Sequence, residues 1–183
     1  MRNAKSPQSI KLTVERAAQK GKSLTRANLA WAHLEWAHLE GAHLERAHLE
    51  WANLAGAHLE GANLEGAHLE GACLEGANLE GACLPSPAIV ISASWGNLSD
   101  NVTIALMRLD ASGHPDPTAF DRWGQGGNCP YTNALVQRVA NFTERRDLWS
   151  PGPPPTLWEA MCMVLDEKCP GWRRKENENG QLV

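Results

Sequence analysis

The feature that most constrains this chain is a leucine that recurs every five residues from Leu24 to Leu84 without a gap. An alanine lies two residues before each leucine from Leu29 onward, and Asn, His or Cys directly precedes each of these leucines. Glu and then Gly usually follow. A period of five fits neither an α-helix, whose apolar positions recur at three and four, nor a half-buried strand, whose faces alternate every two.

A short extended segment followed by a bend satisfies this spacing. In an extended segment, an alanine and the leucine two residues later point the same way. A bend in each unit then coils the chain, and all the leucines face a common axis. One unit cannot bury its apolar face alone, whereas stacked turns bury a continuous core and pair their backbone groups. The repeat therefore predicts a solenoid.

The repeated units strongly resemble the pentapeptide-repeat family, whose motif is a small residue, a polar residue such as Asn or Asp, Leu or Phe, and two variable positions. Residues 61–66, Gly-Ala-Asn-Leu-Glu-Gly, are one example. The resemblance covers about residues 22–86. It implies a β solenoid, a right-handed quadrilateral β-helix of four pentapeptides per coil and a little over three coils. Residues twenty positions apart would then lie on top of one another.

Four parts are expected along the chain. Residues 10–20, closed by Gly21, indicate a helix with a glycine stop signal, so residues 1–21 are expected to form an N-terminal helix that caps the first coil. Pro85 and Pro87 end the repeat because proline cannot continue a ladder of backbone hydrogen bonds. The remaining parts are a mostly α-helical C-terminal domain (87–172) and a polar, disordered tail (173–183).

Within the C-terminal domain, the elements are less sharply indicated. Residues 88–92 could be one last strand of the solenoid or the first element of the next unit. Ser99 can cap a helix that ends near Leu109, and Thr156 with Glu159 forms a capping box that opens a helix to about Glu167. Further helices are expected at residues 118–123 and 131–148, and residues 150–155 are expected to be a stiff linker.

The outward positions contain two candidate binding surfaces. The first is a column of glutamates twenty residues apart, Glu40, Glu60 and Glu80, here called the acidic wall. Like charges about 5 Å apart on neighbouring rungs repel one another. We therefore expect raised glutamate pKa values, a solenoid more stable near pH 6 than near pH 8, and a surface suited to a basic partner.

The second surface lies at the last position of each unit, where glycine is the default. The first half of the repeat has other residues there: Arg26, Trp31, Trp36, Arg46 and Trp51, here called the Trp/Arg patch. Tryptophan and arginine dominate the energetics of protein interfaces. A contiguous aromatic patch is seldom left in water, so we expect either the ends of the chain or a partner to cover it.

No metal or cofactor is expected. The histidines of the repeat project outward from a convex wall, where three or four ligands would not converge. Five cysteines without a C-x-x-C pair indicate reduced thiols. His114, Asp116, Asp121 and Cys129 could be assembled into a hydrolase site, but no motif orders a nucleophile, a base and an oxyanion donor.

Composition limits the remaining classes of function. The chain has 183 residues, 43% hydrophobic and 21% charged, which is ordinary for a soluble protein. Its N-terminus lacks the apolar core of a secretory signal and no apolar run could span a bilayer, so we expect a cytoplasmic protein. The leading hypothesis is a non-catalytic scaffold that binds a protein partner, with neither direct nucleic-acid binding nor membrane attachment expected and a dimer left open. The alternatives are an enzyme with its active site in the C-terminal domain and a partial DNA mimic that acts on gyrase or another nucleic-acid enzyme.

Overall fold

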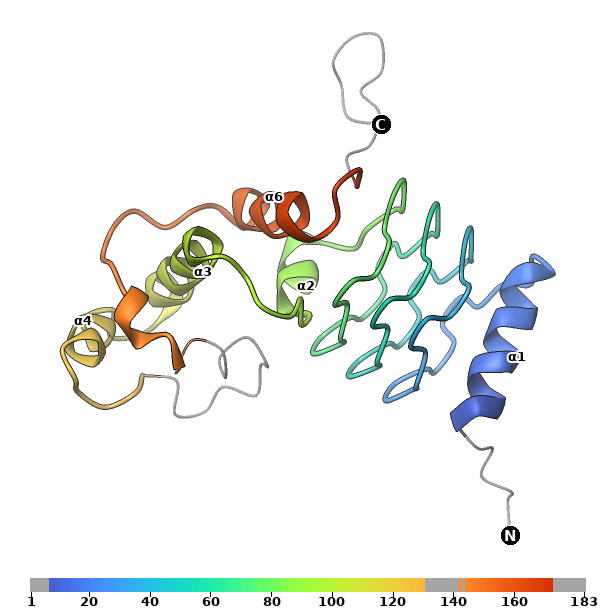
Figure 1. Cartoon of the computed structure of the whole chain (residues 1–183), viewed down its shortest axis with the longest axis horizontal. Helices are drawn as coiled ribbons and strands as arrows, with labels where there is room; N and C mark the ends of the chain where they lie inside the picture. The colour runs from blue at the N-terminus through green and yellow to red at the C-terminus, as the bar shows by residue number, and fades with distance from the viewer. Residues whose placement is uncertain (1–6, 131–141, 143, 173–183) are drawn as a thin grey trace, which may run out of the picture.

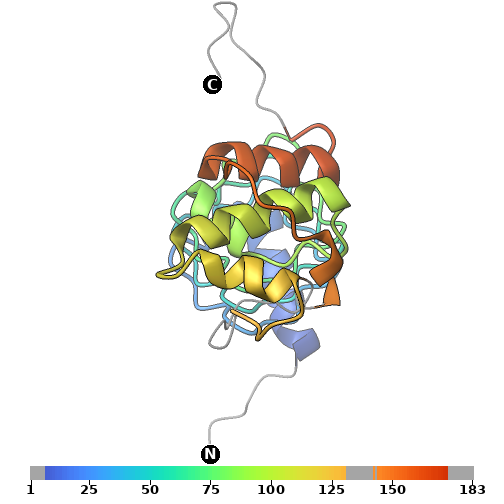
Figure 2. The same cartoon turned by 90° about the vertical axis from the view of Figure 1, so that its left-hand side faces the viewer.

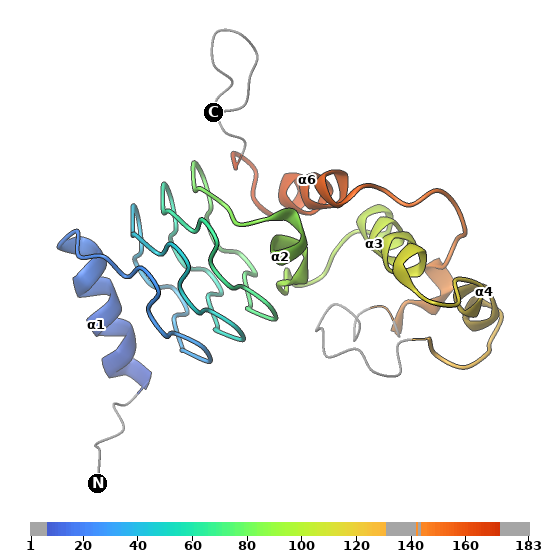
Figure 3. The ribbon, with the colours of Figure 1, turned by 180° about the vertical axis from the view of Figure 1, so that it is seen from behind.

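The computed structural model describes residues 7–130, 142 and 144–172. It begins with helix α1 (Pro7–Gln19), continues through the coils of the repeat, and ends in a group of helices on the opposite side (Figure 1). Seen from behind, α1 and the later helices lie at the two ends of the solenoid, so its side walls face outward (Figure 3).

The coils are held together by parallel backbone bridges between residues twenty positions apart. Asn28 pairs with His48, His38 with His58, and Asn63 with Cys83. The residue after each bridge extends the ladder, since the Leu29 amide donates to the His48 carbonyl oxygen at 2.8 Å. The predicted stacking of residues twenty apart is therefore confirmed.

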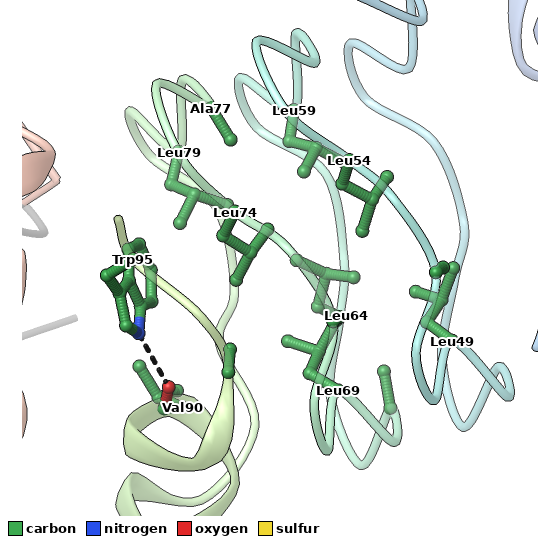
Figure 4. Packing of buried hydrophobic residues seen from close by; sticks show 14 of the residues in the cluster. Leu49, Leu54, Leu59, Leu64, Leu69, Leu74, Ala77, Leu79, Val90 and Trp95 are labelled. Carbon is green, nitrogen blue, oxygen red and sulfur yellow. Dashed lines mark hydrogen bonds between the residues drawn. The ribbon is translucent and has the colours of Figure 1, made fainter. Parts of the chain in front are cut away.

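The core of the solenoid is a stack of leucines and alanines. From Leu34 to Leu79 every leucine of the repeat is at most 1% exposed, and the alanines pack between them (Figure 4). Only Leu24 and Leu84, which end the series, are half-buried. Full burial of a leucine side chain is worth about 1.5–3 kcal/mol, so the stacked leucines dominate the stability of this part.

Helix α1 covers the first coil. Val14 is buried against the core, while Lys11 Nζ donates to the carbonyl oxygen of Glu35 at 2.6 Å. The amide of His38 donates to Glu15 Oε1 at 3.1 Å, so a helix side chain completes the hydrogen bonding of an edge group. The expected capping helix is confirmed, although it begins at Pro7 rather than at Ile10.

The opposite end of the solenoid is closed by the segment that follows Pro85. Residues 88–92 belong to a short helix, α2 (Pro87–Ser92), so the interpretation as a last strand is wrong; Pro87 lies in the first helical turn, where its missing N–H costs nothing. The chain extends only afterwards, where Ser94 bridges to Cys73. Trp95 is buried beneath the last coil and donates from Nε1 to the Val90 carbonyl oxygen at 2.9 Å (Figure 4).

The helices that follow α2 in the described part of the chain pack beyond it, on the side that faces the viewer in Figure 2. Ser99 caps α3 (Asp100–Gly113), and the capping box of Thr156 and Glu159 opens α6 (Leu157–Lys168), both as the sequence predicts. Helix α4 (Thr118–Gly124) also matches its expectation. The helix expected over residues 131–148 lies largely outside the described residues; its described end contains a 3-10 turn, η1 (Arg146–Leu148).

Candidate functional site

The Trp/Arg patch lies at bends where the backbone is left-handed. Arg26, Trp31, Trp36, Arg46 and Trp51 have φ between 56° and 62°, while the equivalent bends of the later coils have glycine. For a residue with a Cβ atom, the left-handed conformation costs about 1–2 kcal/mol. The first half of the repeat therefore keeps five side chains at a cost that glycine would remove.

The tryptophan rings lie along the wall toward the next coil. Trp31 stacks on Trp51 with ring centroids 5.4 Å apart and planes inclined by 11°, which confirms their predicted register. Trp36 instead lies against Gly56, and Trp51 lies against Gly71. A Cβ atom on either glycine would approach the ring to 2.5 Å, so these two bends have no room for a side chain.

Two rings of the patch are open to water. Trp31 and Trp36 are 69% and 67% exposed, while Trp51 is half-buried beneath Trp31. Helix α1 lies at one end of the solenoid (Figure 1). Of the two expected covers, the chain's own described ends are therefore excluded for Trp31 and Trp36, because the caps bury the open coil edges and leave these bends exposed. Cover by a partner stays a prediction.

The patch extends over two walls of the solenoid. Bridged residues form four columns, so the bends between them also form four columns. Arg26 and Arg46 share one column, Trp31 and Trp51 share the next, and Trp36 lies in the third. The Trp31/Trp51 column is the middle of the patch. A partner that contacts the whole patch must therefore bind around a corner of the solenoid rather than on one flat wall.

The acidic wall lies between the column of bends that contains Trp36 and the next column of bends, which contains Gly41. His38, His58 and Asn78 form its bridged column, and the rings of His38 and His58 stack with centroids 4.9 Å apart. Glu60 Oε1 lies 3.4 Å from His58 Nδ1 and accepts from Asn78 Nδ2 at 2.6 Å. Glu40 and Glu80 are exposed, whereas Glu60 is half-buried.

The expected rise in pKa is wrong for Glu40. A hydrogen bond between Glu40 Oε1 and His38 Nδ1, at 3.1 Å, holds the pKa of Glu40 below its ordinary value. A hydrogen bond with the backbone amide of Glu40 lowers this pKa further. These local hydrogen bonds stabilise the ionised form more than burial opposes it.

Sequence reasoning missed the pairing of each repeat histidine with the glutamate two residues later. Nδ1-to-Oε1 distances run from 2.9 Å, between His33 and Glu35, to 3.8 Å, between His68 and Glu70. The signal was present as the recurring triplet His-Leu-Glu, whose first and third side chains leave the same outer surface. The histidine columns are therefore also columns of acid–base pairs, and hydrogen bonds join the pairs of His33, His38, His48 and His58.

The expectation that no site brings three metal-ligating groups together is also wrong. One donor atom each from Glu40, His58 and Glu60 lie within 4.8 Å of one another. These residues come from successive coils, which explains why the sequence alone, without atomic positions, did not reveal the group.

Two of the hydrolase candidates, His114 and Asp116, are hydrogen-bonded to each other. His114 Nδ1 accepts from the Asp116 amide at 3.0 Å, and the Asp116 carboxylate accepts from Thr118 and Arg122. Among the described residues, a groove of about 730 Å³ opens between α3, the prolines at residues 153–155 and α6. Its lining includes Arg108, Trp158 and Cys162. Neither His114, Asp116 nor Cys129 lines it. Within the same part of the chain, no helix is long and apolar enough to cross a membrane.

Comparison with known proteins agrees with the geometry of the coils. The family model described as pentapeptide repeats matches residues 27–50 and 47–84, in eight copies. A comparison with curated proteins gives no match.

Three solved structures are similar to parts of the chain. A pentapeptide repeat protein from Nostoc is 25% identical, over 46% of this chain and 94% of its own, with a TM-score of 0.23. A pentapeptide repeat protein from the Arabidopsis thaliana thylakoid lumen is 22% identical, over 51% and 79%, with a TM-score of 0.23. The pentapeptide repeat protein Rfr23 from the cyanobacterium Cyanothece is 35% identical, over 41% and 58%, with a TM-score of 0.18.

Proposed function

Because residues 27–84 are pentapeptide repeats, we propose that this chain is a non-catalytic scaffold that binds a protein partner through the Trp/Arg patch. The proposal takes the repeat as a right-handed solenoid of a little over three coils, followed by a mostly helical domain. In this arrangement, the caps at both ends leave the side walls available for binding.

The observation that carries the proposal is the combination of backbone strain and exposure at Trp31 and Trp36. Both residues are about two-thirds exposed and both occupy left-handed bends where the later coils have glycine. Such conformations persist at a cost and cluster at functional positions. Folding alone would favour glycine at these bends, so the tryptophans are best explained by contacts with another molecule.

The patch also has the properties of a preorganised binding surface. Trp31 rests on Trp51, and Trp36 rests on the Gly56 bend, so the rings are already held in place before a partner arrives. Tryptophan and arginine are the side chains most enriched at positions that dominate binding energy. Rings ordered in advance lose less conformational entropy when they bind.

The acidic wall is complementary in charge to a partner with basic side chains. Glu40, Glu60 and Glu80 follow one another up the solenoid, next to the column that contains Trp36. A partner that places an apolar pocket over Trp36 and lysine or arginine over these carboxylates would use both surfaces. Charge complementarity of this kind mainly raises the association rate and the specificity.

Substituting the exposed tryptophans by the glycine found at equivalent bends tests the proposal. Affinity capture from the native cell should recover a partner with the wild type and lose it with Trp31→Gly/Trp36→Gly. Trp158→Ala is the matched control, because Trp158 is also exposed, at 49%, but lies on α6. Identical captured proteins for the wild type and the double variant would refute the patch as the docking surface.

A further inference from the structure

The acidic wall contains a convergent group of metal-ligating atoms beside its stacked histidines. Donor atoms of Glu40, His58 and Glu60 lie within 4.8 Å of one another, and the three side chains come from two successive coils. We propose that this group is a binding site for Zn²⁺. The site does not depend on the Trp/Arg patch or on the identity of any protein partner.

The donor set favours zinc over the alkaline-earth cations. Zn²⁺ binds imidazole nitrogen and carboxylate oxygen in tetrahedral sites, whereas Ca²⁺ and Mg²⁺ require oxygen ligands in larger numbers. His38 is a further donor beside the group, because its Nδ1 lies 3.1 Å from Glu40 Oε1 and its ring stacks on that of His58. Glu40 and His58 have side chains 48% and 41% exposed, which leaves them room to rotate toward an ion.

Glu60 supplies the second observation. Its Oε1 accepts a hydrogen bond from Asn78 Nδ2 at 2.6 Å, while its Oε2, like that of Glu50 and that of Glu70, is inaccessible to water and has no hydrogen-bond partner among the described residues. A buried carboxylate oxygen without a partner is unfavourable, and a coordinated cation would remove that cost. Asn78 would then act as an outer-shell group that holds Glu60 in orientation, as the supporting residues of metal sites do.

The charges of the group also favour a bound cation. Glu40 and Glu60 lie on adjacent rungs of one column, and the ion pairs found for them within the described residues are with His38 and His58. With neutral imidazoles, two carboxylates would face each other across the rungs. A divalent cation between them would exchange this repulsion for attraction.

The wall with His48, Glu50, His68 and Glu70 provides an internal comparison. Its rings stack with the same centroid distance of 4.9 Å, and each histidine pairs with the glutamate two residues later. In the described part of the chain, however, these residues do not form a three-donor group like that of Glu40, His58 and Glu60. Twenty residues beyond His68 lies Ala88 rather than an asparagine, so the support that Asn78 gives Glu60 is missing there.

Calorimetric titration of the full chain with Zn²⁺, with the thiols kept reduced, tests the site. We expect one equivalent to bind to the wild type, and His58→Ala and Glu60→Gln each to weaken binding by at least about tenfold. His68→Ala is the matched control and should bind as the wild type does. All three substituted residues lie on the outer surface, and circular dichroism of each variant verifies that the fold is retained.

Two further measurements separate zinc binding here from other causes. Excess Zn²⁺ should raise the melting temperature of the wild type and leave that of His58→Ala unchanged. Mg²⁺ should produce neither effect. Absence of binding to the wild type, equal affinity of His58→Ala, an equal loss in His68→Ala, or equally tight binding of Mg²⁺ would each overturn the proposal.

Discussion

The ring of Trp36 lies against Gly56 so closely that a Cβ atom on this glycine would come within 2.5 Å of the ring. Trp51 and Gly71 repeat the relationship in the neighbouring column of bends. A tryptophan at a bend therefore requires either glycine twenty residues later or, as for Trp31, a second ring that can stack on it. This rule links the tryptophans of the early coils to the glycines of the later ones.

Gly56→Ala is expected to destabilise the solenoid through two effects. Alanine would keep the left-handed backbone at a cost of about 1–2 kcal/mol, and its methyl group would displace the ring of Trp36. Gly61→Ala is the matched control, since Gly61 has the same φ of 65° and nothing within 4 Å of a Cβ atom. Chemical denaturation should give a larger loss of unfolding free energy for Gly56→Ala than for Gly61→Ala. Equal losses would show that the close contact with Trp36 does not affect stability.

Leu54→Glu is expected to unfold the solenoid. The Leu54 side chain is fully buried within the leucine stack, and an ionised carboxylate there would have neither water nor a partner. Leu54→Ala should fold but lose about 2–5 kcal/mol. Leu12→Glu, at a position 46% exposed on α1, is the control and should melt close to the wild type. A wild-type-like melting curve for Leu54→Glu would contradict the assignment of this leucine to the core.

The register of the columns could be predicted from the sequence because it depends only on spacing. Once residues twenty apart are stacked, Trp31 must lie over Trp51 and His38 over His58, whatever the details of the side chains. The exposure of Trp31 and Trp36 could not be predicted in the same way. It depends on where α1 packs, which is a tertiary property that no local spacing encodes.

The helix at residues 88–92 and the pKa of Glu40 were missed for other physical reasons. The sequence Ala-Ile-Val-Ile-Ser is rich in β-branched residues and suits a strand, but Pro87 and the packing of Val90 and Ile91 favour a helix. For Glu40, repulsion along the column was foreseen while the hydrogen bond within one His-Leu-Glu triplet was not. In both cases a contact visible only in three dimensions outweighs the pattern.

The stability of the solenoid is expected to fall in acid. Burial by itself would raise the pKa of Glu35 and Glu50, but hydrogen bonds with His33 and His48 and with backbone amides bring both pKa values below the ordinary 4.5. A carboxylate with a lowered folded-state pKa adds stability above its unfolded pKa and loses it as the pH falls through the folded value.

The melting temperature should therefore drop as the pH falls from about 5 to about 3. Circular dichroism melts across this range measure the effect. His33→Ala/His48→Ala removes hydrogen bonds that lower these two pKa values and should flatten the acid dependence. A melting temperature that rises toward pH 3 would contradict the lowered pKa values.

Trp36→Gly is expected to stabilise the chain although it removes a large side chain. Glycine relieves the left-handed strain at φ 58°, a gain of about 1 kcal/mol, and the ring it removes is two-thirds exposed and so contributes little burial. Trp36→Ala is the control, because alanine also removes the ring but keeps the strained backbone. Chemical denaturation should rank Trp36→Gly above the wild type and Trp36→Ala below Trp36→Gly. If Trp36→Gly instead proved clearly less stable than the wild type, the tryptophan would be there for folding, and the case for a binding role at this bend would lose its main support.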